Sequence, residues 1–343
     1  MTTTDYRLID STLRDGSHAI SHQYREQDVI RIVQGLDAAG VQVIEIAHGD
    51  GIGGSSFNYG FSAVPEKELI AKACEVATNA KIACLLLPGI GLADDLREVN
   101  EMGVQVARIA VHCTEADITE QHIKVAKGLG MEAIGFLMMA HMNSPEGLVE
   151  QALLMQSYGA DTIYIADSAG AMTTEDVRRR VNALVEALEV PVGVHAHNNL
   201  AMAVSNSIAA YEEGAKNLDG TSAGLGAGAG NCPTEILAAV SDKYGIETGV
   251  DALKLMDLAE EVVRPIMPRQ QVIDRAGLIL GYAGVYGSFL LHAERAAERY
   301  GVPQSEILLE LGRRKAVGGQ EDMIIDVALE LARKHAEQEG TSA

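Results

Sequence analysis

Apolar residues occur along the chain in short runs that alternate with longer amphipathic stretches. Eight runs are nearly continuous in Val, Ile, Leu and Ala, which is typical of parallel strands covered on both faces. They cover residues 6–13, 41–47, 80–88, 105–113, 132–140, 161–167, 190–197 and 217–222. The stretches between them repeat apolar residues at helical spacing. In residues 26–39, for example, Val29, Ile32 and Leu36 share one face.

Helix-start and helix-stop signals agree with this alternation. Pro145 suits a first helical turn, and Thr173 is a candidate N-cap for a helix at residues 177–188. Gly40, Gly103 and Gly214 each stand between the end of a helical pattern and the next apolar run. A glycine in that position commonly terminates a helix.

Eight strand-then-helix units predict an α/β fold, a (β/α)₈ TIM barrel. A doubly wound open sheet is the alternative, but eight regular units favour closure. The remaining chain predicts mostly helix, with clear amphipathic pieces at residues 258–263, 304–311 and 323–335. We therefore expect a catalytic barrel at residues 1–255 and a helical domain at residues 256–343, packed on or near the barrel mouth.

Composition narrows the classes of function. The chain of 343 residues has 48 acidic and 27 basic side chains, a formal charge of −21. This charge repels phosphate, so binding to nucleic acid or to an anionic membrane is not expected. The first residues lack a secretory pattern, no apolar stretch is long enough to span a bilayer, and four cysteines form no CxxC pair. We expect a cytoplasmic protein with free thiols.

Histidines and an aspartate at strand ends predict a metal site. His195 and His197 are two residues apart at the end of the seventh run and would point to the same face. Asp15 follows the first run, and alternate strands of a barrel supply the same layer. One carboxylate and two imidazoles favour Mn²⁺ or Mg²⁺ over Zn²⁺, although two histidines disfavour Mg²⁺. The alternatives are hydrogen-bonded core histidines and an Arg14–Asp15 turn contact.

Arg14 and His18 flank this aspartate. Arg14 is the candidate for binding an anionic substrate, because a guanidinium offers two donors and stays charged; a surface ion pair is the alternative. His18 is a candidate general base, with an ordinary loop histidine as the alternative. Three other histidines follow strands but sit in no comparable cluster: His48, His112 and His141.

Other strand ends add candidates for the walls of the site. Ser168 follows the sixth run and could donate to a substrate carboxylate, with a plain turn serine as the alternative. Leu85 and Leu87 share a face and could form an apolar wall, although core packing is the default explanation. Asn231 ends a glycine-rich loop at residues 224–231 and could support the metal ligands from behind, if the loop is not merely flexible.

The helical tail contains a stretch of small and aromatic residues at 277–291. Tyr282 and Tyr286 are four residues apart, so we expect them on one helical face. Packing is the favoured role for Tyr282. One of the two phenols could reach the barrel mouth.

These motifs resemble a known group of enzymes. Leu13-Arg14-Asp15-Gly16, His195-Ala196-His197-Asn198 and the glycine loop are together similar to the superfamily of isopropylmalate synthase and hydroxymethylglutaryl-CoA lyase. The synthases carry Glu-Gln where this chain has Ser17-His18, and the lyase has a cysteine in its glycine loop where this chain has Ala227 and Ala229. Four segments, STLRDGSHA, IADSAGAM, GVHAHNNL and GYAGVYGSFLLH, resemble instead the 4-hydroxy-2-oxovalerate aldolase family nearly end to end.

The resemblance implies a class II aldol cleavage of 4-hydroxy-2-oxopentanoate to pyruvate and acetaldehyde, in the catabolism of aromatic compounds or sterols. Mn²⁺, or Co²⁺ or Mg²⁺ in its place, would be held by Asp15, His195 and His197 and would chelate the 2-oxo acid. The other implied roles are proton removal by His18, enolate stabilisation by Arg14, substrate contact by Ser168, closure by Tyr286 and aldehyde selection by Leu85 and Leu87.

The residues agree on one point without the resemblance. No lysine suited to a Schiff base stands at a strand end, since Lys81 and Lys216 begin their strands. A metal must therefore act as the electron sink.

The resemblance also implies a partner, an acylating acetaldehyde dehydrogenase, in an assembly with two copies of each chain. The tail would dock it, with Gly318-Gly319 at the opening of an aldehyde channel. Two other functions stay open: condensation of an acyl-CoA with a 2-oxo acid, and a non-catalytic scaffold for a dehydrogenase. The Ser17-His18 pair weakens the first, and the intact metal set speaks against the second.

Overall fold

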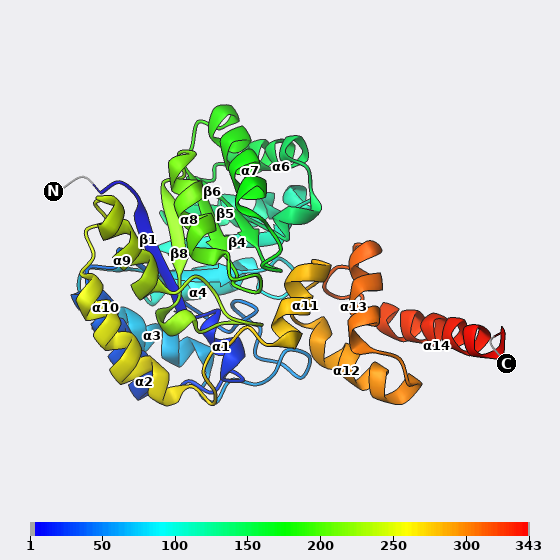
Figure 1. The fold of residues 1–343 in the computed structure, drawn as a ribbon. Coiled ribbons are helices and arrows are strands. Elements are labelled where there is room, and N and C mark those ends of the chain that lie inside the picture. Colours follow the sequence, from blue (N-terminus) through cyan, green and yellow to red (C-terminus); the bar gives the residue numbers. More distant parts are fainter. Residues whose placement is uncertain (1–3, 342–343) are drawn as a thin grey trace.

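The computed structural model describes residues 4–341, and its centre is a closed barrel of eight parallel strands in sequence order (Figure 1). The strands are β1 Arg7–Leu13, β2 Val43–Ile46, β3 Lys81–Leu86, β4 Val106–His112, β5 Glu132–Met138, β6 Thr162–Asp167, β7 Val192–Ala196 and β8 Asn217–Gly220. The barrel closes where β1 pairs with β8, with Ile9 opposite Asp219. The predicted barrel is confirmed, and the open sheet is wrong.

Helices follow the strands, and all but the short first one, which borders the cavity at the barrel mouth, cover the outside of the barrel. They are α1 Gly16–Ala19, α2 Glu26–Ala38, α3 Glu66–Val76, α4 Ala93–Glu101, α5 Glu120–Gly128, α6 Pro145–Ser157, α7 Thr174–Ala187, α8 Ala203–Glu212, α9 Thr234–Tyr244 and α10 Ala252–Leu258. A capping box between Thr173 and Asp176 starts α7, as predicted. The three predicted stop glycines, Gly40, Gly103 and Gly214, all have positive φ.

Four further helices form a separate group beside the barrel mouth: α11 Arg275–Ala283, α12 Phe289–Tyr300, α13 Gln304–Arg313 and α14 Met323–Thr341. They share an apolar core of their own, which includes Leu280, Phe289 and Leu308. Figure 1 shows this orange and red group projecting from one end of the barrel. The expected helical region is confirmed.

One prediction about this region is wrong. Residues 277–291 are not one helix, because α11 ends at Ala283 and Gly284 takes a left-handed conformation with φ +67. Tyr286 therefore lies in the turn before α12, and it shares no helical face with Tyr282. Tyr282 is 72% exposed, so its predicted role in packing is also wrong.

The barrel interior contains an apolar cluster that includes Ile9, Val43, Ile134 and Phe136. Polar side chains gather towards the carboxyl ends of the strands, which is where barrels of this type place their sites. Among residues 4–341, no helix is long and apolar enough to cross a membrane.

Candidate active site

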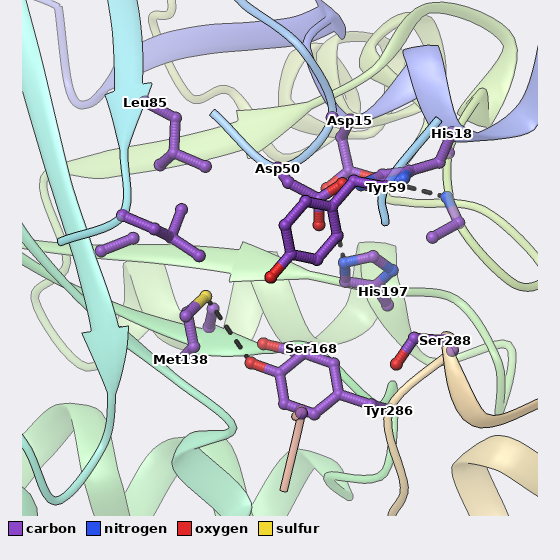
Figure 2. Close-up of a pocket in the computed structure, with 18 of the residues that line it drawn as sticks. Asp15, His18, Asp50, Tyr59, Leu85, Met138, Ser168, His197, Tyr286 and Ser288 are labelled. Carbon is purple, nitrogen blue, oxygen red and sulfur yellow. Dashed lines mark hydrogen bonds and ion pairs between the residues drawn. The ribbon is translucent and has the colours of Figure 1, made fainter. Parts of the chain in front are cut away.

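Three side chains converge at the carboxyl ends of β1 and β7. Asp15 lies in the turn after β1, His195 lies in β7, and His197 directly follows that strand. The Asp15 Oδ2 atom is 3.2 Å from His195 Nε2 and 3.6 Å from His197 Nε2. All three are buried, and their ligand atoms lie within 4.8 Å of one another. Figure 2 shows Asp15 and His197 facing each other. The structure brings the three predicted ligands together.

Neighbouring groups orient His195 for ligation. Its Nδ1 donates to Asp219 Oδ2 at 2.8 Å, which leaves Nε2 as the atom that faces Asp15. A carboxylate behind a ligating histidine is a common arrangement in metal sites. Asn231 Nδ2 lies 3.0 Å from His195 Nε2, and the buried Asn231 Oδ1 has no hydrogen-bond partner. Asn231 thus lies beside the His195 atom that faces Asp15, and its expected supporting role stays a prediction.

The charges of these groups suit a cation. Burial lowers the pKa of His197 to about 4, so this imidazole is neutral near pH 7. Burial opposes ionisation of Asp15, but Arg14 and the two histidines hold its pKa well below the usual range. For His195, burial lowers the pKa and hydrogen bonds to Asp15 and Asp219 raise it above its usual value. A carboxylate, two imidazoles and an unpaired amide oxygen fit a divalent metal ion, which would displace the His195 proton.

Arg14 is buried beside this group rather than at the surface. Its Nη1 donates to Asp15 Oδ2 at 2.7 Å and its Nε to Glu45 Oε2 at 2.9 Å. The Arg14–Asp15 contact therefore exists, but the alternative of a surface ion pair is wrong. Arg14 still lines the cavity described below, so it is a cation placed beside the candidate metal ligands.

His18 in α1 also faces this cavity, and two further histidines stand behind it. The ring of His22 contacts His18 edge-on, with centroids 5.3 Å apart, and stacks on His48 at 3.7 Å. The expectation that His48 sits in no cluster is wrong. It failed because His22 and His48 meet only after the loop that follows β2 folds back on α1. Burial and the neighbouring imidazoles lower the pKa of His22 to about 3.

A cavity of about 910 Å³ extends to the helical region, and among the residues that line it are Arg14, Asp15, His18, His195 and His197. Leu85 and Leu87 line one wall, as expected. Ser168 also lines the cavity and accepts a hydrogen bond from the Met139 N–H at 3.1 Å. The Tyr286 hydroxyl donates to Met138 Sδ at 3.6 Å and points inward from the helical side (Figure 2).

Several residues of the site were missed by the sequence reasoning. Asp50 and Tyr59, from the loop after β2, line the cavity. Glu45, Arg108 and Asp219 are buried inside the barrel below the site. Glu45 and Arg108 had a readable signal, because each is a charged residue between apolar residues of a buried strand, and such a residue needs a buried partner.

Family models match almost the whole chain. Residues 5–262 match the HMGL-like family, and residues 271–333 match the DmpG-like communication domain. Among solved structures, the carboxyl transferase domain of Rhizobium etli pyruvate carboxylase with pyruvate is similar, with a TM-score of 0.81 and 16% identity. That match covers 97% of this chain and 62% of the other, and at this identity it shows the fold alone.

Curated relatives are much closer in sequence. The 4-hydroxy-2-oxovalerate aldolase of Carboxydothermus hydrogenoformans is 62% identical over 95% of this chain and 97% of the relative. The enzyme of the same name from Thermomicrobium roseum is 59% identical over 99% of this chain and 95% of the relative. The chain therefore belongs to the 4-hydroxy-2-oxovalerate aldolase family, which are carbon–carbon lyases with an HMGL-like barrel.

Proposed function

We propose that this chain cleaves 4-hydroxy-2-oxopentanoate, and related 4-hydroxy-2-oxo acids, to pyruvate and an aldehyde, acetaldehyde for the first. We further propose that Mn²⁺ is the metal, with Co²⁺ or Mg²⁺ as substitutes, and that the reaction serves the breakdown of aromatic compounds or sterols. The observation that carries the proposal is the buried group of Asp15, His195 and His197, open to a cavity in a chain of this family.

Breaking the C3–C4 bond leaves an electron pair on C3 that needs a sink. A divalent ion held by Asp15, His195 and His197 would supply Lewis acidity for that enolate. A Schiff-base lysine cannot accept this electron pair, because no lysine among the described residues lines the cavity. The second neighbour of the developing charge is Arg14, whose guanidinium stays protonated beside Asp15 and Glu45.

The walls divide the cavity into a polar and an apolar end. Arg14 and Ser168 offer donors to the carboxylate and keto end of a 2-oxo acid. Leu85 and Leu87 face the space left for the aldehyde end, so we propose that they limit its length and orientation. We propose that Asn231 supports the site from beside its ligands, since its amide lies 3.0 Å from His195 Nε2.

His18 is the proposed base for the 4-hydroxyl proton. As that proton moves to the imidazole, the C4–O bond becomes a carbonyl, C3–C4 breaks, and the aldehyde leaves. The enolate carbon C3 then takes up a proton to give pyruvate, and loss of the proton gained by His18 restores the base. Tyr286 closes the cavity over the substrate from the turn between α11 and α12. Its burial, which raises the phenol pKa, keeps it protonated as a donor.

Replacement of His18 by Ala tests this assignment. Turnover should fall about 10²- to 10⁴-fold, the usual range for a general base, while Mn²⁺ binding stays as in the parent protein. The measurements are kcat and the Mn²⁺ dissociation constant. Loss of the metal together with activity would assign His18 to the metal site instead.

We also propose that the helical region, residues 256–343, docks an acylating acetaldehyde dehydrogenase in an assembly with two copies of each chain. Support comes from its match to the DmpG-like communication domain. The cavity also runs from the candidate metal ligands to Gly318 and Gly319 in that region. An aldehyde released at Leu87 could therefore leave on the helical side. Co-purification of the two chains and their mass in solution test this proposal.

Pyruvate release from 4-hydroxy-2-oxopentanoate tests the main proposal. The assay is run on protein as purified, after EDTA, and after EDTA followed by Mn²⁺. We expect pyruvate in the first case, none in the second and recovery in the third. No pyruvate under any of these conditions would overturn the proposed function.

A further inference from the structure

Six buried side chains form a closed ring of ionic and hydrogen-bonded contacts at the base of the cavity. In order of contact they are Arg14, Glu45, Arg108, Asp219, His195 and Asp15. They come from β2, β4, β7, β8 and the turn after β1, so the ring joins strands that are not neighbours in the barrel. None of the six is more than 5% exposed.

One half of the ring leads to the proposed substrate-binding guanidinium. Glu45 Oε2 accepts from Arg14 Nε at 2.9 Å and is 3.0 Å from Arg108 Nη1. The second contact is an ion pair without a hydrogen bond, because Arg108 Nη1 has no hydrogen-bond partner. A single carboxylate oxygen of Glu45 thus bridges two cations and offsets their mutual repulsion.

The other half leads to a proposed metal ligand. Arg108 Nη2 donates to Asp219 Oδ2 at 2.5 Å, and the same oxygen accepts from His195 Nδ1 at 2.8 Å. His195 Nε2 then faces Asp15 Oδ2, which accepts from Arg14 Nη1 and closes the ring. Each terminal nitrogen of Arg108 therefore contacts one carboxylate, that of Glu45 or that of Asp219. Each of these carboxylates in turn orients one residue of the site, Arg14 or His195.

Arg108 itself is locked in place and has no access to substrate. Its guanidinium carbon is 4.7 Å from the ring centroids of both Phe136 and Tyr164. Arg108, Glu45 and Asp219 are not among the residues that line the cavity. They cannot touch a bound 2-oxo acid, so any effect they have on the reaction acts through Arg14 and His195.

Filling a barrel interior with charged side chains carries a desolvation penalty. Apolar side chains of similar volume would be as stable or more so, because ion pairs lose hydration on burial. The rest of the interior is filled with residues such as Ile9, Val43 and Ile134. The ring is fully buried directly beneath the candidate site, whereas the ion pairs of Glu132 with Arg7 and Lys81 at the other end of the barrel are partly exposed, which favours a role in the site over a role in packing.

We propose that Arg108 is a positioning residue that couples the two halves of the site: through Glu45 it fixes the guanidinium of Arg14, and through Asp219 it fixes the metal-facing imidazole of His195. This inference rests on the proposed function, which assigns substrate to Arg14 and metal to His195. It adds that the affinity for metal and the binding of the 2-oxo acid depend on one buried residue that touches neither.

Three conservative variants separate the halves. Asp219→Asn should weaken Mn²⁺ binding about 10- to 100-fold, the usual cost of losing a group behind a ligand. Glu45→Gln should raise KM for 4-hydroxy-2-oxopentanoate at saturating Mn²⁺ and leave Mn²⁺ affinity within about twofold of the parent. Arg108→Lys keeps the charge but not the two-pronged fork, so it should impair both. Mn²⁺ binding is measured on EDTA-treated protein by the loss of the free-ion EPR signal, without turnover.

Arg178→Lys is the matched control. Arg178 also forks between two carboxylates, Glu212 and Glu213, but on the outside of the barrel. It should leave Mn²⁺ affinity and KM unchanged. If Arg108→Lys lowers the melting temperature and leaves both quantities unchanged, Arg108 is merely structural and the inference is overturned.

The double variant Glu45→Gln/Asp219→Asn tests the coupling itself. Glu45 and Asp219 are joined through Arg108 on one side of the ring and through Arg14, Asp15 and His195 on the other. If the coupling runs through Arg108, their effects on kcat/KM should be non-additive in the parent protein and close to additive in the Arg108→Lys background. Additive effects in the parent protein, or equal non-additivity in the Arg108→Lys background, would overturn the coupling through Arg108. Failure of the proposed function has a different signature, because the unaltered protein would then fail to bind Mn²⁺ or to release pyruvate.

Discussion

The barrel wall and the helical wall of the cavity are held in place by different kinds of contact. On the barrel side, Asp15 and His195 are fixed by short contacts to Arg14 and Asp219, and those partners are themselves paired. On the helical side, Tyr286 stands in a turn and its hydroxyl makes one weak contact, 3.6 Å from a sulfur atom. Its support is the apolar packing of α11–α14.

This difference assigns the chemical step to the barrel wall and closure of the cavity to the helical wall. Directional contacts hold a side chain in one geometry, which metal binding and proton transfer require. Apolar packing holds a group of helices together but lets it move as a unit, which suits a cover that meets a partner. Changes in the barrel should therefore remove catalysis outright, and changes in the helical group should alter access while the metal site survives.

Asp15→Asn should have the largest effect. It removes the carboxylate that both histidines face, so Mn²⁺ binding should be lost and activity should fall by about 10³-fold or more. Metal content and pyruvate release measure this. Asp50→Asn, at the same mouth but outside the three ligands, should keep Mn²⁺. Equal loss in both variants would contradict the special place of Asp15.

Gly49→Ala should have the next largest effect. A Cβ at residue 49 would lie 2.5 Å from His18 Cε1 and would push the imidazole out of position. A displacement of about 1 Å costs about 10²-fold in turnover, and the melting temperature should change little. Gly128→Ala is the control, since a Cβ there meets nothing within 4 Å. Normal kcat in Gly49→Ala would mean that the position of the His18 imidazole does not determine turnover.

Gly312→Ala tests the helical wall by itself. A Cβ at residue 312 in α13 would overlap the carbonyl oxygen of Ala283 at the end of α11. Overpacking of this kind costs about 1–3 kcal/mol. Hydrogen exchange should therefore speed up in α11–α13 but not in the barrel strands, with Mn²⁺ affinity unchanged. Equal acceleration in the strands would show that the two regions are one cooperative unit.

The smallest expected effect is a pH dependence of stability from His22. Its pKa is lowered to about 3, chiefly by burial, and an unfolded histidine titrates near 6.5. The unfolded state therefore takes up a proton on His22 at a higher pH than the folded state does. The contribution of His22 to the free energy of unfolding is fully present above about pH 6.5 and is lost as the pH drops towards 3. His22→Asn should flatten the melting temperature between pH 7 and 4.5. An unchanged slope would show that His22 is not the titrating group.

The sequence predicted the convergence of the candidate metal ligands better than the buried groups behind them. His195 and His197 were found because residues two apart on a strand share a face, and Asp15 because it ends another strand of the same parity. Glu45, Arg108 and Asp219 were missed, because which buried charges meet across a barrel depends on the stagger of the strands, and one sequence does not show it.

The prediction that Tyr282 and Tyr286 share one helical face was wrong because a turn separates them. Residues 277–291 keep a helical rhythm of apolar positions, yet Gly284 adopts a left-handed conformation that ends α11. A glycine tolerates both conformations, so its presence did not decide between them. Tyr286 reaches the cavity because of that break, whereas Tyr282 stays on the helix and faces outward.

The central claim is that catalysis requires a divalent ion at Asp15, His195 and His197. Its most direct test is an Mn²⁺ titration of EDTA-treated protein, with bound ion followed by EPR and pyruvate release measured on the same samples. Activity should rise in proportion to a single bound ion per chain and stay absent in Asp15→Asn. Full turnover in protein without a bound divalent ion would contradict the account.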